Sequence, residues 1–393
     1  MNGKTKLSRF LLRGLSYVLV ATVSAAVALA LWGSRPSKLV ELEQIITNNF
    51  IGQADVEKAK DAAADAMVEA LGDRWSYYIS AQEYAAYLEN KNNAYVGIGI
   101  TILARGDRTG FDILEVAPGS SAQEGGILPG DILVEAEGES VLEMDADGVK
   151  NIIRGDAGTF VSVGVIRNGE KKTYTLERKN IQVAVATGEL LSGNIGLIRI
   201  ANFNKNCAKE TIARVEELRQ QGAEKLIFDV RNNPGGYVNE MLDVLDYLLP
   251  EGVLFRDLDY LGREDVEYSD KDCLELPMAV LVNGNSYSAA EFFAAALEEF
   301  DWATVVGEKT TGKGYYQNTI KLSDGSAVNL STGKYFTPSG KNLSEVGGLT
   351  PDVVVQVDKE TADLIYAQAV PAAEDPQIQA AVANLQKNAD KNP

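Results

Sequence analysis

The sequence predicts an α/β protein that carries an inserted β-rich segment and a helical region in front of it. Three observations support this fold class. After Asn180, apolar segments typical of strands alternate with amphipathic helical segments. Between residues 93 and 180, short apolar segments are separated by glycine-containing turns. Before residue 93, leucine, isoleucine and alanine recur at helical spacing.

The composition limits the function classes. The chain has 393 residues, enough for two or three domains with their own cores. The net charge of −19 argues against binding to nucleic acid backbones, so no nucleic acid partner is expected. The absence of histidine and the presence of only two cysteines argue against a zinc site, and no metal or other cofactor is predicted. We interpret Cys207 and Cys273 as two unpaired thiols.

Residues 1–37 predict a basic cytoplasmic flank and a transmembrane anchor. Residues 14–32 contain no charged side chain and have about the length that crosses a bilayer. The flank before them is basic, with Lys4, Lys6, Arg9 and Arg13. This charge predicts that the flank stays cytoplasmic and that the body is extracytoplasmic. The segments 26–28 and 28–30 also fit signal-peptidase sites, which would give a secreted protein. We favour an uncleaved, single-pass anchor over cleavage and over a buried soluble helix.

Residues 38–92 are predicted to be a helical region. Apolar side chains recur at helical spacing from Leu39 to Ile46, and residues 62–71 are alanine-rich with one apolar face. These helices could pair with a partner chain or pack on the rest of the protein, and the sequence leaves both alternatives open.

Residues 93–180 are predicted to be a small β domain with a peptide-binding loop. The pair Gly97 and Gly99 does not form a dinucleotide loop, because position 102 is isoleucine and not glycine. A glycine loop that leads into a strand can instead direct backbone N–H groups at the terminal carboxylate of a peptide. The candidate substrate-binding residues are Gly97, Ile98, Gly99 and Ile100. With the later Leu128-Pro-Gly-Asp-Ile-Leu133 segment, this region resembles a PDZ domain of the bacterial type.

Residues 181–358 are predicted to be the α/β core, followed by a helical tail at 359–393. The core has expected strands at 195–200, 225–230 and 278–282, expected helices at 208–221 and 238–249, and mainly strands from 303 to 355. Such alternation is typical of a mainly parallel sheet covered by helices.

The segment from Ala279 to Gln317 contains the candidate catalytic residues. A short apolar strand leads into a turn of small residues, and an apolar helix from about Ser288 to Phe300 leaves it. This arrangement presents Ser288 at a helix N-terminus, and Lys313 follows between two glycines. Because the chain has no histidine, lysine is the best substitute as the base for a serine nucleophile. The alternative is that Ser288 caps the helix and Lys313 is a solvated loop charge.

A nucleophilic serine also needs donors for the oxyanion. The N–H of Ala289 and one from Gly235 or Gly236 are the candidates, since these glycines follow a strand and precede a helix. Taken alone, the Asn233-Pro-Gly-Gly236 segment would be an ordinary turn.

The segment Gly307–Lys313 matches G-x-x-x-x-G-K, the pattern of a phosphate-binding loop. Such a loop requires Ser or Thr next, and the sequence has Gly314. The following residues also predict a strand instead of a helix, so nucleotide binding is disfavoured.

Several ordered motifs make the chain, from about residue 39 to 385, resemble the C-terminal processing peptidases, serine–lysine proteases of the tail-specific type. The motifs are Asp229–Gly236, Val282–Glu291, Gly307–Gln317, Tyr335–Gly340 and Gly348–Asp352. The resemblance implies a crotonase-like protease core with the PDZ domain inserted and N-terminal helices. It implies cleavage of protein substrates near nonpolar C-termini, and assembly as a homo-oligomer.

The resemblance also implies roles for single residues. Ser288 takes the position of the nucleophile, Lys313 that of the base, and Gln317 that of the residue that orients the lysine, whereas Ser286 aligns with a noncatalytic serine. Tyr287 stands where the family usually has a small residue, and Tyr315 and Tyr316 approach Gln317; these departures could alter the substrate groove. The alternative function is a noncatalytic, membrane-tethered PDZ scaffold, which would predict loss of the serine or the lysine.

Overall fold

The computed structural model describes residues 19–24 and 37–389, which fall into two units divided after Leu71. In the first unit, residues 19–24 are helical, and two longer helices follow, α2 (Lys38–Asn49) and α3 (Val56–Glu69). The side chains of Ser37 and Asp55 accept hydrogen bonds from the first turns of α2 and α3 and so cap both helices. An apolar groove of about 250 Å³ lies between the two helices.

The predicted membrane segment, residues 14–32, lies mostly outside the described residues. Within residues 19–24 and 37–389, none of the helices reaches the length and apolar character that spanning a bilayer requires.

The prediction that residues 38–92 are helical throughout is wrong in one place. Tyr77–Ile79 forms a strand, β1, which pairs with a core strand, β18 (Ala327–Phe336). The helix α4 (Ala81–Lys91) follows, with Ser80 and Glu83 forming a reciprocal cap at its start. Residues 72–92 therefore belong to the second unit, and pairing with a distant strand stabilises β1.

The predicted PDZ-like region forms its own antiparallel sheet. The chain enters and leaves it through a two-stranded stem in which β2 (Ala94–Gly97) pairs with β9 (Lys179–Gln182). The sheet order is β3-β4-β5-β7-β8, so β3 is an edge strand, and β6 pairs with β5. The elements are β3 (Ile100–Ala104), β4 (Phe111–Val116), α5 (Ser121–Gly125), β5 (Ile132–Ala136), β6 (Glu139–Ser140), α6 (Ala146–Ile153), β7 (Phe160–Arg167) and β8 (Glu170–Glu177).

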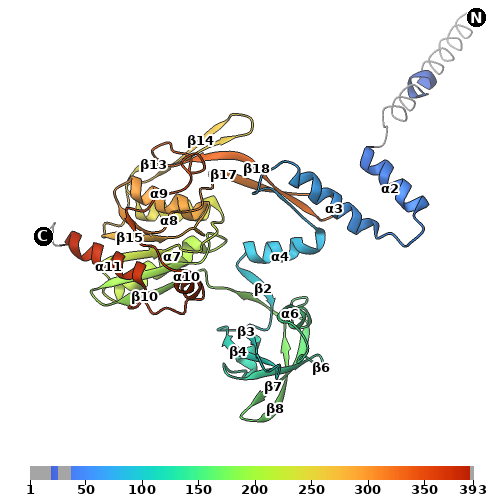
Figure 1. Ribbon diagram of the computed structural model, residues 1–393, viewed down its shortest axis with the longest axis horizontal. Coiled ribbons are helices and arrows are strands. Elements are labelled where there is room, and N and C mark those ends of the chain that lie inside the picture. Colours follow the sequence, from blue (N-terminus) through green and yellow to red (C-terminus); the bar gives the residue numbers. More distant parts are fainter. Residues whose placement is uncertain (1–18, 25–36, 390–393) are drawn as a thin grey trace, which may run out of the picture. The chain divides into compact units, whose positions relative to one another are not determined.

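The core is a six-stranded sheet in the order β10-β11-β12-β15-β16-β19, parallel except at β10 (Figure 1). Successive side chains of a strand point to opposite faces of the sheet. Alternate residues of these strands accordingly belong to two separate apolar clusters, one on each face. Helices α7–α9 pack on one face, and α11 packs on the other. The elements are β10 (Ala186–Leu191), β11 (Ile195–Ile200), α7 (Cys207–Gln220), β12 (Lys225–Asp229), α8 (Val238–Leu248), β15 (Met278–Val282), α9 (Ala289–Glu299), β16 (Ala303–Gly307), β19 (Val353–Val354), α10 (Lys359–Tyr366) and α11 (Pro376–Ala389).

A second sheet, in the order β1-β18-β13-β14 with β17 paired to β18, completes the described core. The sequence predicted strands after residue 303 but contained no prediction for the hairpin β13 (Gly252–Asp259) and β14 (Glu264–Ser269). The strand β17 (Tyr315–Lys321) begins two residues after Lys313 and therefore follows the candidate base.

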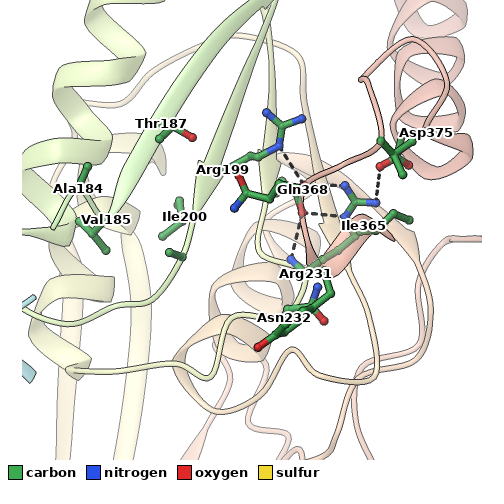
Figure 2. Close-up of a pocket in the computed structure, with 14 residues that line it drawn as sticks. Ala184, Val185, Thr187, Arg199, Ile200, Arg231, Asn232, Ile365, Gln368 and Asp375 are labelled. Atoms are coloured by element: carbon green, nitrogen blue, oxygen red, sulfur yellow. Dashed lines mark hydrogen bonds and ion pairs between the residues drawn. The ribbon is translucent and has the colours of Figure 1, made fainter. Parts of the chain in front are cut away.

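The C-terminal helices are part of the core and not a peripheral tail. Ile378, Ala381 and Leu385 of α11 are buried against the sheet. A buried ionic network also connects this region to the loop after β12. Figure 2 shows the guanidinium of Arg231, which binds Asp229 at 2.7 Å and Asp375 at 2.8 Å. This network fixes the start of the Arg231–Gly236 loop, which leads to the candidate oxyanion glycines.

We expect Asp375→Ala to lower the free energy of unfolding by about 3 kcal/mol, because it removes one partner of a buried guanidinium. The matched control is Asp363→Ala, which breaks the exposed Lys359–Asp363 pair and should cost about 0.5 kcal/mol or less. Thermal melting of both variants measures the difference, and equal shifts would contradict the structural role of the network.

Candidate active site

The three candidate segments meet because they follow the carboxyl ends of neighbouring parallel strands. The Arg231–Gly236 loop follows β12, the turn to Ser288 follows β15, and the segment to Lys313 follows β16. These strands are adjacent in the sheet, so their carboxyl ends share one edge. Ser288, Lys313 and Gln317 line one cleft of about 1020 Å³ together with Ala289, Gly235 and Gly236.

Ser288 lies in the tight turn between β15 and α9. Its φ of 60° and ψ of −125° are unusual for a residue with a side chain, and such backbone strain clusters at functional turns. The residue occupies the N-cap position of α9, as the sequence indicated, and it faces the cleft. The other serine of the turn, Ser286, is fully buried, and its hydroxyl donates to the Val230 carbonyl at 2.7 Å.

The carboxylate of Glu291 connects the turn of Ser288 to the segment of Lys313. This side chain is 0% exposed and accepts the backbone N–H groups of Ser288 at 3.1 Å, Gly312 at 2.6 Å and Lys313 at 2.9 Å. The Thr310 hydroxyl is a fourth donor. Burial raises the pKa of Glu291, although these four hydrogen bonds oppose the rise. Glu291 is the last residue of the sequence motif Val282–Glu291, and the sequence predicted no role for it.

Lys313 lies in a buried environment with two aromatic rings near its amine. Its ammonium nitrogen is 4.5 Å from the ring centre of Trp75 and 5.8 Å from that of Tyr287. Burial, followed by the positive charge of Lys91, lowers the pKa of Lys313 to about 8, although the charges of Asp73 and Glu291 oppose this. Among the described residues, Lys313 has no salt-bridge partner and no hydrogen bond to Ser288.

The two candidate oxyanion glycines differ in their hydrogen bonding. The N–H of Gly235 donates to Asn233 Oδ1 at 2.8 Å and is therefore occupied. Within the described part of the chain, the N–H groups of Gly236 and Ala289 have no acceptor. A Cβ at Gly235 would lie 2.9 Å from the Ala289 nitrogen and 2.9 Å from Ser288 Cβ, so glycine permits this close approach. The geometry favours Gly236 as the donor and Gly235 as the close-packing residue.

Gln317 lies in the cleft but does not contact the lysine through a hydrogen bond in the described structure. Its Nε2 donates to the Tyr315 carbonyl at 3.1 Å and to Ser331 Oγ at 3.0 Å. Lys313 precedes β17 and Gln317 lies within it, so the two residues do not share a strand. The orienting role of Gln317 stays a prediction.

The cleft wall contains residues that the sequence analysis missed. Residues 74–91 contribute Arg74, Trp75, Tyr77, Tyr84, Tyr87 and Lys91, all from a region read as helical without a role in the site. Tyr287, noted as a departure from the family pattern, packs on Trp75 with ring centres 5.5 Å apart. The density of aromatic residues between 74 and 87 was the available signal in the sequence.

The candidate carboxylate loop lies between the stem and the edge strand of the PDZ-like sheet. The carbonyl groups of Ile98 and Gly99 accept hydrogen bonds from Ala122 and Ala117. Across the described residues, the N–H groups of Ile98 and Gly99 have no acceptor. Gly99 has a φ of 83°, and a Cβ there would lie 2.3 Å from Ser120 Cβ, so this loop requires glycine.

Gly307–Lys313 leads into strand β17 and not into a helix, which agrees with the rejection of a phosphate loop. The cavity of about 240 Å³ in Figure 2 is lined in part by Arg231 and its partners Asp229 and Asp375. Cys207 and Cys273 are free thiols.

Comparisons with known proteins agree with this arrangement. Residues 194–355 match the model of peptidase family S41, and residues 113–167 match that of a PDZ domain. A carboxy-terminal processing protease, CtpA, of Bacillus subtilis is 30% identical over 341 residues, which cover 86% of this chain and 72% of the relative. A CtpA-like serine protease of Staphylococcus epidermidis is 28% identical over 371 residues, 91% of this chain and 75% of the relative.

One solved structure extends the likeness to the fold. A protein from Bacteroides fragilis described as an S41 protease superposes with a TM-score of 0.51 at 16% identity, over 92% of this chain and 99% of that chain. The mixed α/β architecture is consistent with the expected crotonase-like core. The chain therefore belongs to peptidase family S41, and it is a serine-type peptidase that contains a PDZ domain.

Proposed function

We propose that the chain is a membrane-anchored serine endopeptidase that cleaves protein substrates near nonpolar C-termini, with Ser288, Lys313 and Gln317 as its catalytic residues. One observation carries this proposal. A strained serine and a buried lysine whose pKa is lowered to about 8 line the same cleft, at the carboxyl edge of a parallel sheet. A lysine with this pKa supplies a neutral amine near physiological pH, which is what a general base requires.

The proposed reaction begins with proton transfer from the Ser288 hydroxyl to the neutral amine of Lys313 as Oγ attacks the scissile carbonyl carbon. The oxyanion that forms accepts hydrogen bonds from the N–H groups of Ala289 and Gly236, each worth roughly 3 kcal/mol. The Lys313 ammonium then returns the proton to the leaving amine, and water releases the acyl group by the same steps. In this scheme, Gln317 limits the positions that the amine can take once substrate fills the cleft.

The lining of the cleft supports a preference for apolar substrate segments. Aromatic and apolar side chains contribute much of the wall, among them Trp75, Tyr87, Tyr237, Met241 and Phe255. Such surfaces gain free energy when they bury apolar side chains of a peptide. The Bacillus subtilis relative is a carboxy-terminal processing protease, and this likeness supports cleavage near the C-terminus of the substrate.

We assign recruitment of the substrate to the PDZ domain. The unpaired N–H groups of Ile98 and Gly99 can bind a terminal carboxylate, with Gly97 and Ile100 on either side of them. The neighbouring strand β3 is an edge strand, so the last residues of a peptide can add to the sheet beside it. Peptides with a free, apolar C-terminus are the expected ligands.

The proposal also includes a membrane anchor and assembly as a homo-oligomer. Residues 14–32 and their basic flank support a single-pass anchor with the catalytic body outside the cytoplasm, or a secreted body if the segment is cleaved. The exposed apolar side chains of α2, such as Leu39, Leu42 and Ile45, support a homo-oligomer. The alternative function, a noncatalytic PDZ scaffold, is disfavoured because both the serine and the lysine are present in one cleft.

The first catalytic prediction concerns the two central residues. Ser288→Ala and Lys313→Ala should each lower kcat/KM at least about 1,000-fold, since each removes one half of the reacting pair. Ser286→Ala should keep its activity per folded molecule, because that hydroxyl only bonds Val230 and Asn283 in the turn. Cleavage of a fluorogenic peptide by purified variants decides this, and full activity of Lys313→Ala would overturn the mechanism.

The second prediction concerns pH. Because the neutral amine is the base, kcat/KM should rise with pH and level off above about 8, where Lys313 has lost its proton. Below that pH, each unit should lower the rate about tenfold. Histidine cannot account for this titration, because the chain contains none. A pH–rate profile that still climbs towards the pKa of free lysine would contradict a depressed value for Lys313.

The third prediction concerns the PDZ domain. Amidating the C-terminus of a bound peptide should weaken its affinity about tenfold or more, because the loop N–H groups lose their acceptor. Gly99→Val should have a similar effect, since its side chain would collide with Ser120. Calorimetric titration of the full chain carrying Ser288→Ala compares the acid and amide peptides without cleavage. Equal affinities for the two peptides would remove the carboxylate role of the loop.

A further inference from the structure

Tyr335 of β18 lines the cleft that contains both proposed catalytic residues, Ser288 and Lys313. Its side chain is 3% exposed. The ring packs on Phe255 and Phe292, with ring centres 6.0 Å and 5.8 Å apart. Phe292 belongs to α9, the helix that begins immediately after the nucleophile. This apolar packing fixes the ring and therefore leaves the hydroxyl little freedom.

The Tyr335 hydroxyl bonds the segment of one member of the proposed pair and shares the cleft with the other. It donates its single hydrogen to the main-chain carbonyl of Lys313. Its oxygen can then only accept, and the Ser288 hydroxyl, which lines the same cleft, is a group that can donate to it. Burial and the charge of Glu291 raise the pKa of Tyr335, and the hydrogen bond from Ser288 opposes that rise. The phenol can thus connect the hydroxyl of the nucleophile to the backbone of the base.

We propose that Tyr335 is a positioning residue whose hydroxyl sets the placement of Ser288 Oγ relative to the Lys313 segment. This inference rests on the proposed function of Ser288 and Lys313. Glu291 provides the corresponding constraint on the main chain, because its carboxylate binds the N–H groups of the same two residues. The nucleophile and the base are therefore held at two levels, one through their backbone N–H groups and one through the serine hydroxyl and the lysine carbonyl.

Tyr335 does not take part in the proton transfer. Its raised pKa keeps the phenol protonated throughout the working range of pH. During attack, the Ser288 proton moves to the Lys313 amine while the bond from Oγ to the carbonyl carbon forms. The serine O–H must turn from the phenol to the amine for this step, and a fixed phenol keeps Oγ within reach of that amine.

The test is Tyr335→Phe, which keeps the ring packing and removes only the hydroxyl. We expect kcat for a peptide to fall about tenfold with KM unchanged, the size of effect that one lost hydrogen bond produces. Acylation by a small aryl ester, which does not use the peptide groove, should slow by the same factor. In this assay, the amplitude of the initial burst of acylation measures the number of competent sites, and the rate of the burst measures how fast each site reacts. Misfolding therefore lowers the amplitude, and loss of positioning lowers the rate.

Tyr247→Phe is the matched control. This half-buried tyrosine in α8 donates its hydroxyl to Glu216 outside the cleft, so its loss should lower the melting temperature and leave the acylation rate unchanged. An acylation rate of Tyr335→Phe within twofold of wild type, or an effect confined to KM or to burst amplitude, would overturn the inference. Ser288→Ala and Lys313→Ala are assayed in parallel. If either still acylates at the wild-type rate, the proposed site fails; if both are inactive and Tyr335→Phe is normal, only the positioning role fails.

Discussion

The rest of the site depends on the buried carboxylate of Glu291. Four donors surround it, and three of them are backbone N–H groups from the two segments that present the serine and the lysine. A buried carboxylate without partners would be very costly, so the fold is stable only when these two segments are in place around it. The residue is provided by α9 three positions after Ser288, and its contacts extend to the segment that follows β16. One side chain thereby couples helix formation to the assembly of the site.

Burial also explains why a lysine can serve where the chain has no histidine. The rings of Trp75 and Tyr287 replace water around the Lys313 amine, and the charge of Lys91 adds to the effect. These contributions outweigh those of Asp73 and Glu291, and the pKa of Lys313 falls to about 8. The wall that supplies Trp75 and Lys91 comes from residues 72–92, which join the core through the pairing of β1 with β18. A small strand therefore contributes to the chemistry of a residue more than two hundred positions away.

Much of the fold could be predicted from the sequence, because local patterns determine it. The β11 strand has the predicted bounds, and α7, α8 and α9 lie within one or two residues of theirs. The strand β1 and the hairpin of β13 and β14 could not be predicted, since pairing with distant strands stabilises them and short patterns do not show it. In the candidate site, the sequence predicted Ser288 and Lys313 from their spacing, the absence of histidine and the family resemblance, and the structure brings both to one cleft. The sequence could not choose between Gly235 and Gly236, because that choice depends on which N–H the Asn233 side chain occupies.

The central claim is that Ser288 is a nucleophile made reactive by Lys313 and not a helix cap beside a solvated charge. Peptide mapping by mass spectrometry after treatment with a fluorophosphonate tests it most directly, since the reagent needs an activated serine but no peptide substrate. The account predicts a single adduct on Ser288 that forms in the wild-type protein and is absent from Lys313→Met, although the serine is still present there. An adduct on another serine, or equal labelling of Ser288 with and without the lysine, would contradict it.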